Sequence, residues 1–303
     1  MDAAADAAYG SLLGACVGDA AGAVLEFMHR MSTEDEVEEA LQMPGGGLWQ
    51  VGPGQVTDDS ELALCMAQAL LNSPASSRTV PLDTVAAWYG KWLHSPPFDI
   101  GSTTRAALSA ARGNPVVEGL AARMTAAAAQ NSLAAALPQV TPPGGTHSST
   151  SGGSASSAQP GSQASCEHDV SADSAADVKP KAAAAREAVL SWLGEAQQDG
   201  PGPEVYHAAG FMKWGFVHAF RALALTLPFE EALRQLHGGD KNTNAVIVGG
   251  LLGAYWGAEG ISATLTGPVL CRCSSSVGIK RPEFLQTGQL PELFEKLWAA
   301  ASS

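Results

Sequence analysis

The chain is short of positive charge. Its 303 residues hold 17 Lys and Arg against 30 Asp and Glu, which gives a net charge of −13. Binding to a nucleic-acid backbone or to an anionic membrane needs clustered Lys and Arg. Neither is therefore expected as the main task, and a site for an anionic ligand would have to use backbone N–H groups or metal ions.

Cysteines and long apolar runs are also few. The five cysteines, an odd number, lie mostly among apolar neighbours, which favours reduced thiols in a reducing compartment over a disulfide framework. No uncharged stretch reaches the length of about 18 residues that suggests a membrane helix. The first residues lack the basic and apolar regions of a secretory signal. We therefore expect an intracellular, cytoplasmic protein with no membrane part.

Alternating polar and apolar runs of strand length are missing as well. Ala-rich and Leu-rich helical patterns instead predict helices at 59–72, 82–93, 102–111, 182–193 and 207–226. Two further apolar segments carry glycines at a spacing of four, namely Gly10, Gly14, Gly18 and Gly22, and later Gly249, Gly253 and Gly257. Such stripes let two helix backbones approach closely. These two helices are predicted to form the central pair of an all-α bundle.

Residues 138–183 differ from the rest in composition. They are rich in Ser, Ala, Gly and Pro and show no apolar period. Such a segment cannot bury enough surface to offset the entropy of ordering it, which predicts a disordered insertion. Neither flank has a complete set of motifs by itself, so we expect residues 1–303 to form one domain that carries this insertion.

Two short acidic stretches stand where helices are expected to begin. Each alone is explained most simply as a helix cap. Together they supply more oxygens than capping uses, and an oxygen-only set suits a hard cation such as Mg²⁺. If both helix starts meet, six side chains converge in a geometry that suits a binuclear metal site. These side chains are Thr57, Asp58, Asp59, Asp240, Asn242 and Thr243.

Two more features carry possible chemistry. Glu26 follows Asp19 by seven residues, which predicts that both lie on one face of the first striped helix. It is a candidate general base, although a surface Glu is an equally good explanation from position alone. Before the helix at 102–111, backbone N–H groups and hydroxyls offer an anion cradle, or an ordinary helix cap. The residues concerned are Gly101, Ser102, Thr103 and Thr104.

Four segments together resemble the ADP-ribosylglycohydrolase family. They are GSLLGACVGDAAGAVLEF at 10–27, TDDSELAL at 57–64, DIGSTTRAAL at 99–108 and GGDKNTNAVIVGGLLGAYWG at 238–257, and RPEF at 281–284 fits the family's usual tail. The resemblance implies an all-α orthogonal multi-helix bundle with a central metal-binding cleft. It also implies two Mg²⁺ or Mn²⁺ ions and hydrolysis of the bond between ADP-ribose and a protein side chain or a related small acceptor.

The same resemblance implies roles for individual residues. Thr57, Asp58 and Asp59 match the first set of metal ligands, and Asp240 and Thr243 match the outer members of the second, with Asn242 between them as a metal ligand through its amide oxygen. Asp58 and Asp59 also belong to the expected catalytic set. Glu26 matches an acidic residue implicated in catalysis. Residues 101–104 match the loop around the ADP-ribose phosphates. Which ADP-ribosyl linkage is cleaved is left open, because acceptor choice depends on loops around the cleft.

Some positions depart from the family pattern. Asn242 stands where the family usually has a second Asp, so this ligand brings an oxygen without charge, and we expect one weakened metal position. Lys241, at a variable position, is expected to point to solvent. The segment at 130–138 keeps only Asn131, Leu133 and Pro138 of its usual pattern. These departures keep an alternative open, a catalytically impaired module that binds ADP-ribose.

Overall fold

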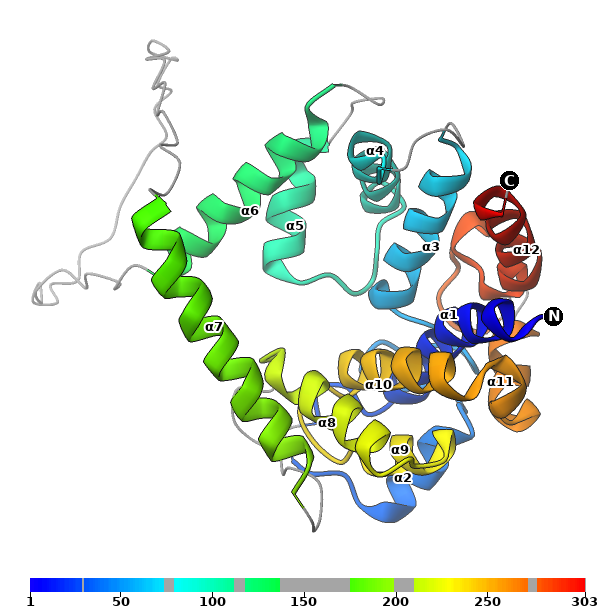
Figure 1. Ribbon diagram of the computed structural model, residues 1–303. Helices are drawn as coiled ribbons and strands as arrows, with labels where there is room; N and C mark the ends of the chain where they lie inside the picture. Colours follow the sequence, from blue (N-terminus) through cyan, green and yellow to red (C-terminus); the bar gives the residue numbers. More distant parts are fainter. Residues whose placement is uncertain are drawn as a thin grey trace, which may run out of the picture.

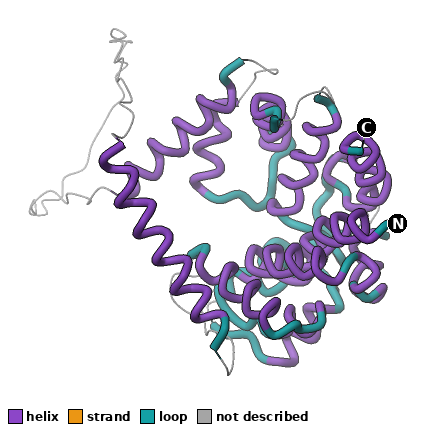
Figure 2. The backbone as a smooth tube through the Cα atoms, viewed as in Figure 1, coloured by secondary structure: helices purple, strands orange, loops and turns teal. Residues whose placement is uncertain are grey.

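The structure, a computed structural model, describes residues 1–28, 30–73, 79–111, 118–136, 175–198, 210–271 and 277–302. Within these ranges the regular secondary structure is helical, with loops between the helices and no strand, as Figure 2 shows. An isolated antiparallel bridge between Gly46 and Val51 is the sole β-type pairing described. The predicted all-α fold is confirmed.

The described ranges contain twelve α-helices joined by loops and short 3₁₀ turns (Figure 1). In chain order they are α1 (Ala3–Gly22), α2 (Glu34–Leu41), α3 (Asp58–Leu71), α4 (Leu82–Leu93), α5 (Ser102–Leu108), α6 (Leu120–Ala136), α7 (Ala175–Ala196), α8 (Lys213–Ala224), α9 (Phe229–Arg234), α10 (Lys241–Trp256), α11 (Ala263–Leu270) and α12 (Leu290–Ala301).

The two glycine-striped helices, α1 and α10, pack against each other along their length (Figure 1). A Cβ atom built on Gly14 would lie 2.3 Å from the carbonyl oxygen of Gly249, and one built on Gly253 would lie 2.0 Å from that of Gly10. The residue order in these contacts is reversed, so the helices run antiparallel. Their backbones touch directly, which confirms the predicted central pair.

Two apolar clusters surround this pair, and α3 contributes to both. The larger cluster joins α1 and α10 to α8, α9, α11 and α12, and it includes Leu64 of α3. The second joins α4, α5 and α6, and it includes Cys65 of α3. Because neighbouring residues on a helix point in different directions, α3 can serve both clusters. Its first turn is thereby held between the two parts of the core.

Two expectations about helix limits were wrong in detail. Helix α1 ends at Gly22, so Glu26 lies beyond it in a turn, where Phe27 takes a left-handed φ of 56° that no helix accommodates. Helix α7 begins at Ala175, so the last nine residues of the segment predicted as disordered, 175–183, are helical. Alanine has the highest helix propensity, which accounts for this start.

The rest of that segment, 138–174, lies outside the described residues, as do 207–209 of the helix predicted at 207–226. Helix α8 begins at Lys213, after the turn at 210–212. In the described ranges, no helix has both the length and the apolar composition to cross a membrane.

We predict that Gly14→Ala destabilises the protein. The new methyl group would meet the Gly249 carbonyl oxygen at 2.3 Å, and because that atom belongs to the backbone, the two helices must separate. Overpacking of this kind costs about 1–3 kcal/mol of unfolding free energy, measurable by urea denaturation.

Gly194→Ala is the matched control. Gly194 lies inside α7, and an added Cβ would meet nothing within 4 Å. Its replacement should be neutral or stabilising by up to about 1 kcal/mol, from helix propensity alone. Equal effects of both substitutions would contradict close backbone contact as the reason for the stripe.

Candidate active site

Asp19, a buried residue in the last turn of α1, caps the start of α3 with its side chain. Its carboxylate accepts hydrogen bonds from the backbone N–H groups of Thr57, at 3.0 and 3.1 Å, and of Ser60, at 3.0 Å. It also accepts one from the Thr57 hydroxyl at 2.8 Å. Thr57 is the N-cap residue of α3 but makes no capping bond with its own side chain. The first turn of α3 is thus fixed to α1 without using the carboxylates of Asp58 and Asp59.

The start of α10 meets the start of α3 at this point. The Thr243 hydroxyl donates to Asp59 Oδ2 at 3.1 Å, and Asn242 Nδ2 donates to Thr57 Oγ1 at 3.2 Å. Asp240 is the N-cap residue of α10, and its carboxyl group interacts with Thr243 in the first turn. The two acidic stretches, 185 positions apart at Asn242 and Thr57, therefore lie side by side. The predicted meeting of the two helix starts is found, while their role as metal ligands stays a prediction.

Glu26 reaches the same region from the turn after α1, and it is buried rather than exposed. The Trp49 indole N–H donates to Glu26 Oε2 at 3.0 Å. Trp49 lies in a tight turn closed by the backbone pairing of Gly46 with Val51 at 2.7 and 2.9 Å. Gly47 of this turn lies directly against residues 23 and 24. A Cβ atom built on Gly47 would be 2.9 Å from Val24 Cα, so the close approach needs a glycine here. A surface position for Glu26 is therefore excluded.

Asp99 belongs to this group of carboxylates, although its side chain was not among the predicted site residues. It is buried, and it interacts with the carboxyl groups of Asp58 and Glu26. The sequence contains little indication of this role. Asp99 is the first residue of the segment DIGST, in which the glycine and hydroxyl residues that follow it form the predicted anion cradle. Only the fold shows that the loop before α5 turns toward the start of α3.

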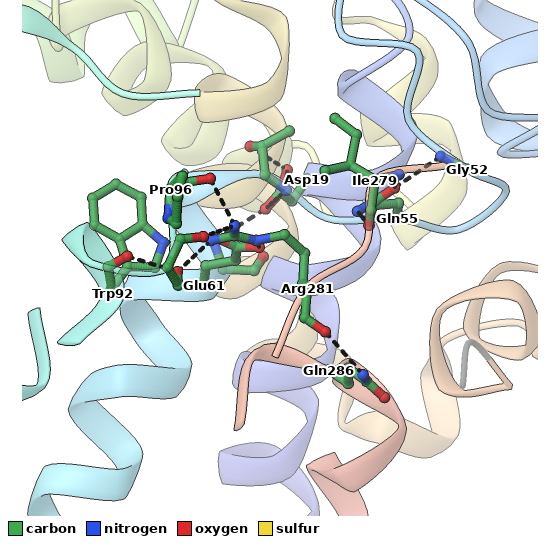
Figure 3. Close-up of polar contacts among 12 residues, drawn as sticks. Asp19, Gly52, Gln55, Glu61, Trp92, Pro96, Ile279, Arg281 and Gln286 are labelled. Carbon is green, nitrogen blue, oxygen red and sulfur yellow. Dashed lines mark hydrogen bonds and ion pairs between the residues drawn. The ribbon is translucent and has the colours of Figure 1, made fainter. Parts of the chain in front are cut away.

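A buried ion pair ties the Asp99 loop to α3 (Figure 3). Arg281 donates to both carboxylate oxygens of Glu61, at 2.7 and 2.8 Å, and Trp92 Nε1 donates to Glu61 Oε2 at 2.6 Å. The same guanidinium donates to the carbonyl oxygens of Ser95, at 2.6 Å, and Pro96, at 3.0 Å. Helix α3, the segment around Arg281 and the chain leading to Asp99 therefore hold one another in place.

Among the residues that the structure describes, no Lys or Arg forms an ion pair with the carboxylates of the site. In the part of the chain that the structure describes, the ion pairs of Lys and Arg engage other acidic residues. Burial, followed by repulsion from neighbouring carboxylates, raises the pKa of Asp58 to about 9, of Glu26 to about 8 and of Asp59 to about 7. Burial also raises the pKa of Asp19, Asp99 and Asp240. The site holds protons unless another cation takes their place.

The donor set fits a divalent cation in its chemistry. Asn242 Oδ1 is buried and has no hydrogen-bond partner, although a buried amide oxygen normally has one. The other end of the same amide donates to the Thr57 hydroxyl, and carboxylate, hydroxyl and amide oxygens are the ligands that Mg²⁺ and Mn²⁺ prefer. Among the described side chains, no three from His, Cys, Asp and Glu form a ready metal centre by themselves. A site here would therefore also need the Thr and Asn oxygens.

Lys241 does not point to solvent, contrary to expectation. Its side chain is 1% exposed, and its ammonium group donates to the Leu25 carbonyl oxygen at 3.2 Å. The cause is the contact between α1 and α10. A Cβ on Gly22 would lie 2.5 Å from Asn242 Cα, so the start of α10 is covered by the end of α1.

The residues predicted to cradle phosphates precede and open α5. Gly101 is its N-cap residue and has no side chain with which to cap the helix. Thr103 and Thr104 border a groove of about 500 Å³ whose other walls are mainly apolar side chains of α3, α4, α5 and α6. The groove offers both hydroxyls and apolar surface. The phosphate-binding role of Gly101, Ser102, Thr103 and Thr104 stays a prediction.

Comparison with known proteins points to one family. The model of the family described as ADP-ribosylglycohydrolase matches residues 1–298. The chain is 37% identical over 100 residues to the ADP-ribosyl-dinitrogen reductase glycohydrolase of Rhodospirillum rubrum, which is 33% of each chain. It is 38% identical over 106 residues to the ADP-ribosylarginine hydrolase Tri1 of Serratia proteamaculans, covering 34% of this chain and 28% of that one. The matched part thus spans about a third of the length of these relatives.

A solved structure described as an ADP-ribosylglycohydrolase-related protein complex has the same fold. The superposition gives a TM-score of 0.54 with 20% sequence identity, and it covers 99% of this chain and 100% of the other. At this identity the likeness concerns the fold.

We predict that the metal-free protein loses stability as pH rises from about 5 to about 8. The folded site carboxyls have pKa values near 6 to 9, above the unfolded values near 4. The folded state therefore binds more protons in this window, so the contribution is complete below the unfolded pKa and is lost as pH rises through the folded values. Thermal melting of the chelator-treated protein at several pH values measures this.

Mn²⁺ should raise the melting temperature more at pH 8 than at pH 5.5, because metal ions compete with protons for the same oxygens. The Asp58→Asn/Asp59→Asn double variant separates the site from the other titrating groups. It should flatten the pH dependence and remove most of the Mn²⁺ effect. An unchanged pH profile in this variant would count against the assignment.

We predict that Arg281→Met is strongly destabilising, because it leaves the Glu61 carboxylate buried without its cation. Breaking a buried pair in this way costs about 3–5 kcal/mol, measurable by urea denaturation. The Arg281→Met/Glu61→Leu double variant should recover part of that loss. Arg30→Met, which breaks the exposed pair between Arg30 and Glu36, is the control and should change stability little.

Proposed function

The chain belongs to the ADP-ribosylglycohydrolase family, and on this premise we propose that it hydrolyses ADP-ribosyl linkages. The proposed active site comprises the starts of α3 and α10, the Glu26 turn and Asp99. One observation carries the proposal above all. Carboxylates from four separate parts of the chain gather at one place, with Glu26 and Asp99 buried and Asp58 and Asp240 half-buried, and the described residues form no ion pair with them.

We propose that the site binds two Mg²⁺ or Mn²⁺ ions. The ligands are the side chains named from the sequence: Thr57, Asp58, Asp59, Asp240, Asn242 and Thr243. When bound, such ions polarise ribose hydroxyls and neutralise the negative charge of the site. Three carboxylates in this set face the four positive charges of two divalent ions. One metal position is therefore expected to be weaker, because Asn242 brings no charge.

Glu26 is the proposed general base. Its pKa, raised to about 8 by burial and by Asp99, lies near the pH at which the protein would work, which suits proton transfer. The Trp49 N–H fixes one oxygen of the Glu26 carboxylate and leaves the other able to take a proton. In hydrolysis, water forms a bond to the anomeric carbon and Glu26 takes a proton from that water. The bond from the anomeric carbon to the acceptor breaks, and the acceptor leaves with its electron pair and takes up the proton that Glu26 received.

In this proposal Asp58, Asp59 and Asp99 do not transfer the proton of the attacking water. They stabilise the charge that develops in the transition state. Positive charge develops at the anomeric carbon as the acceptor leaves. Carboxylates fixed nearby before the reaction stabilise that charge without having to reorganise. The bonds from Asp19 to the start of α3 and from Arg281 to the Asp99 loop provide this fixation.

For the substrate, we propose ADP-ribosylarginine in a protein. Two relatives are named for ADP-ribosylated dinitrogen reductase and for ADP-ribosylarginine. A guanidinium is a planar cation and suits an acidic site. The phosphates would meet the N–H groups and hydroxyls of Gly101, Ser102, Thr103 and Thr104. The adjacent apolar groove offers a surface for the adenine ring.

The second candidate function is binding of ADP-ribose without turnover. Asn242 favours it, because an uncharged ligand weakens a metal position on which turnover depends. The intact Glu26 and Asp99 favour catalysis. A gain of activity on restoring the carboxylate distinguishes the two functions.

We predict that the purified chain releases ADP-ribose from an ADP-ribosylarginine peptide in the presence of Mn²⁺. Asn242→Asp should lower the Mn²⁺ concentration needed for half-maximal rate severalfold, because it adds a ligand charge. Asp58→Ala should lower the rate by at least about 100-fold, the order expected when a preorganised electrostatic group is removed. Chromatographic assay of released ADP-ribose measures all three.

Glu292→Ala, at an exposed carboxylate of α12, serves as the control and should leave the rate unchanged. An ADP-ribosylserine peptide tests the choice of acceptor. If calorimetry shows that ADP-ribose binds while neither the wild type nor Asn242→Asp hydrolyses either peptide, the binding function replaces the catalytic one.

A further inference from the structure

Lys241 is a buried lysine at the centre of the second acidic stretch. Its neighbours in sequence, Asp240 and Asn242, belong to the proposed ligand set, but its own side chain leaves that set and passes under the end of α1. The stem lies among apolar side chains of α2 and α9, beside a cavity of about 20 Å³. Burying an ammonium group is costly. A specific contact of the ammonium group must therefore offset the cost of its burial.

The one contact described for the ammonium group is the hydrogen bond to the Leu25 carbonyl oxygen at 3.2 Å. Among the described residues, Lys241 forms no ion pair. The Leu25 carbonyl belongs to the peptide bond that leads into Glu26. Lys241 thus contacts the backbone next to Glu26, the proposed general base, and does not contact the Glu26 carboxylate.

The Glu26 turn is weakly held by its own backbone. Leu25 N–H donates to Gly22 O at 3.0 Å, whereas Met28 N–H reaches Leu25 O only at 3.4 Å. Phe27 has a φ of 56°, a conformation that is unfavourable for a residue with a Cβ atom. Such a turn persists when its surroundings impose it. A charge-assisted hydrogen bond to Leu25 O is stronger than a bond between neutral groups.

We propose that Lys241 is a positioning residue for Glu26. Through Leu25 O it fixes the backbone of the turn, while Trp49 fixes the side chain, so that one carboxylate oxygen stays directed at the substrate. The same helix turn supplies Asp240 and Asn242, so Lys241 also couples the placement of the general base to that of the second ligand stretch. The catalytic part of this inference rests on the proposed function.

A double-mutant cycle with Lys241→Met and Glu26→Gln tests the catalytic part. Methionine keeps the length of the stem and removes the charge and the donor. Lys241→Met should lower kcat for the ADP-ribosylarginine peptide about tenfold with KM within twofold, because positioning acts on the chemical step. In the Glu26→Gln background the same change should alter kcat by less than twofold, because no base remains to be positioned. Lys241→Arg, which keeps a cationic donor, should restore part of the rate.

Lys213→Met is the matched control. Lys213 is a largely buried lysine on α8 whose ammonium donates to Glu195 at 2.7 Å, and its replacement should leave kcat unchanged. Thermal melting should show that Lys241→Met is as stable as the wild type or more stable, because a buried charge is replaced by an apolar group. An equal loss of kcat in both Glu26 backgrounds, or no loss in either, overturns the proposal.

Hydrogen exchange tests the anchor itself without using activity. In Lys241→Met the amides of residues 23–28 should exchange at least tenfold faster than in the wild type, while those of α12 stay the same. Unchanged exchange at 23–28 overturns the inference even if the rate falls. If the wild type hydrolyses no ADP-ribosyl peptide while exchange responds as expected, the proposed function fails and the anchoring of the turn stands.

Discussion

The direct backbone contact between α1 and α10 is the constraint on which the site depends. Gly14 and Gly249 meet so closely that neither position has room for a methyl group. The contact continues to Gly22, which lies against Asn242. Because the two helices run antiparallel, the end of α1 and the start of α10 come to the same place. The Glu26 turn and the stretch from Asp240 to Thr243 are thereby neighbours, although more than 200 positions separate them.

Helix capping by a distant residue leaves oxygens available at this place. A helix start normally uses its own Thr, Ser or Asp side chain to satisfy the first N–H groups. In α3 that task falls to Asp19, which reaches across from α1. Asp58 and Asp59 are consequently not needed as caps. Asp58 and Asp59, which are typical helix-capping residues, are thus free for another role. From the sequence alone they could be helix caps or metal ligands, and only the fold shows that the cap is supplied by Asp19.

The sequence was sufficient for features that depend on local periodicity. The spacing of glycines predicted the central pair, and the two cap-like stretches predicted which helix starts would meet. Features that depend on the path of loops were not predictable in this way. Asp99 is followed by an ordinary helix start, and nothing near it in sequence shows that Arg281 holds its loop against α3. Lys241 was expected in solvent because Lys usually is; its burial results from the coverage of α10 by α1. Glu26 was placed on a helix that in fact ends at Gly22, because packing, rather than propensity, sets that end.

A comparison within α3 separates structural from functional carboxylates. Glu61, three residues after Asp58, is buried to a similar or greater degree, yet it has a bidentate Arg281 and the Trp92 N–H as partners. The chain therefore supplies a cation where a buried carboxylate only has to be stable. Asp58 and Asp59, earlier in the first turns of the same helix, lie among other carboxylates, and no described Lys or Arg forms an ion pair with them. Mutual repulsion in the folded state is a cost that selection for stability alone would remove by a single substitution. Its presence beside a satisfied ion pair on the same helix argues that these carboxylates are arranged for a cation from outside the chain.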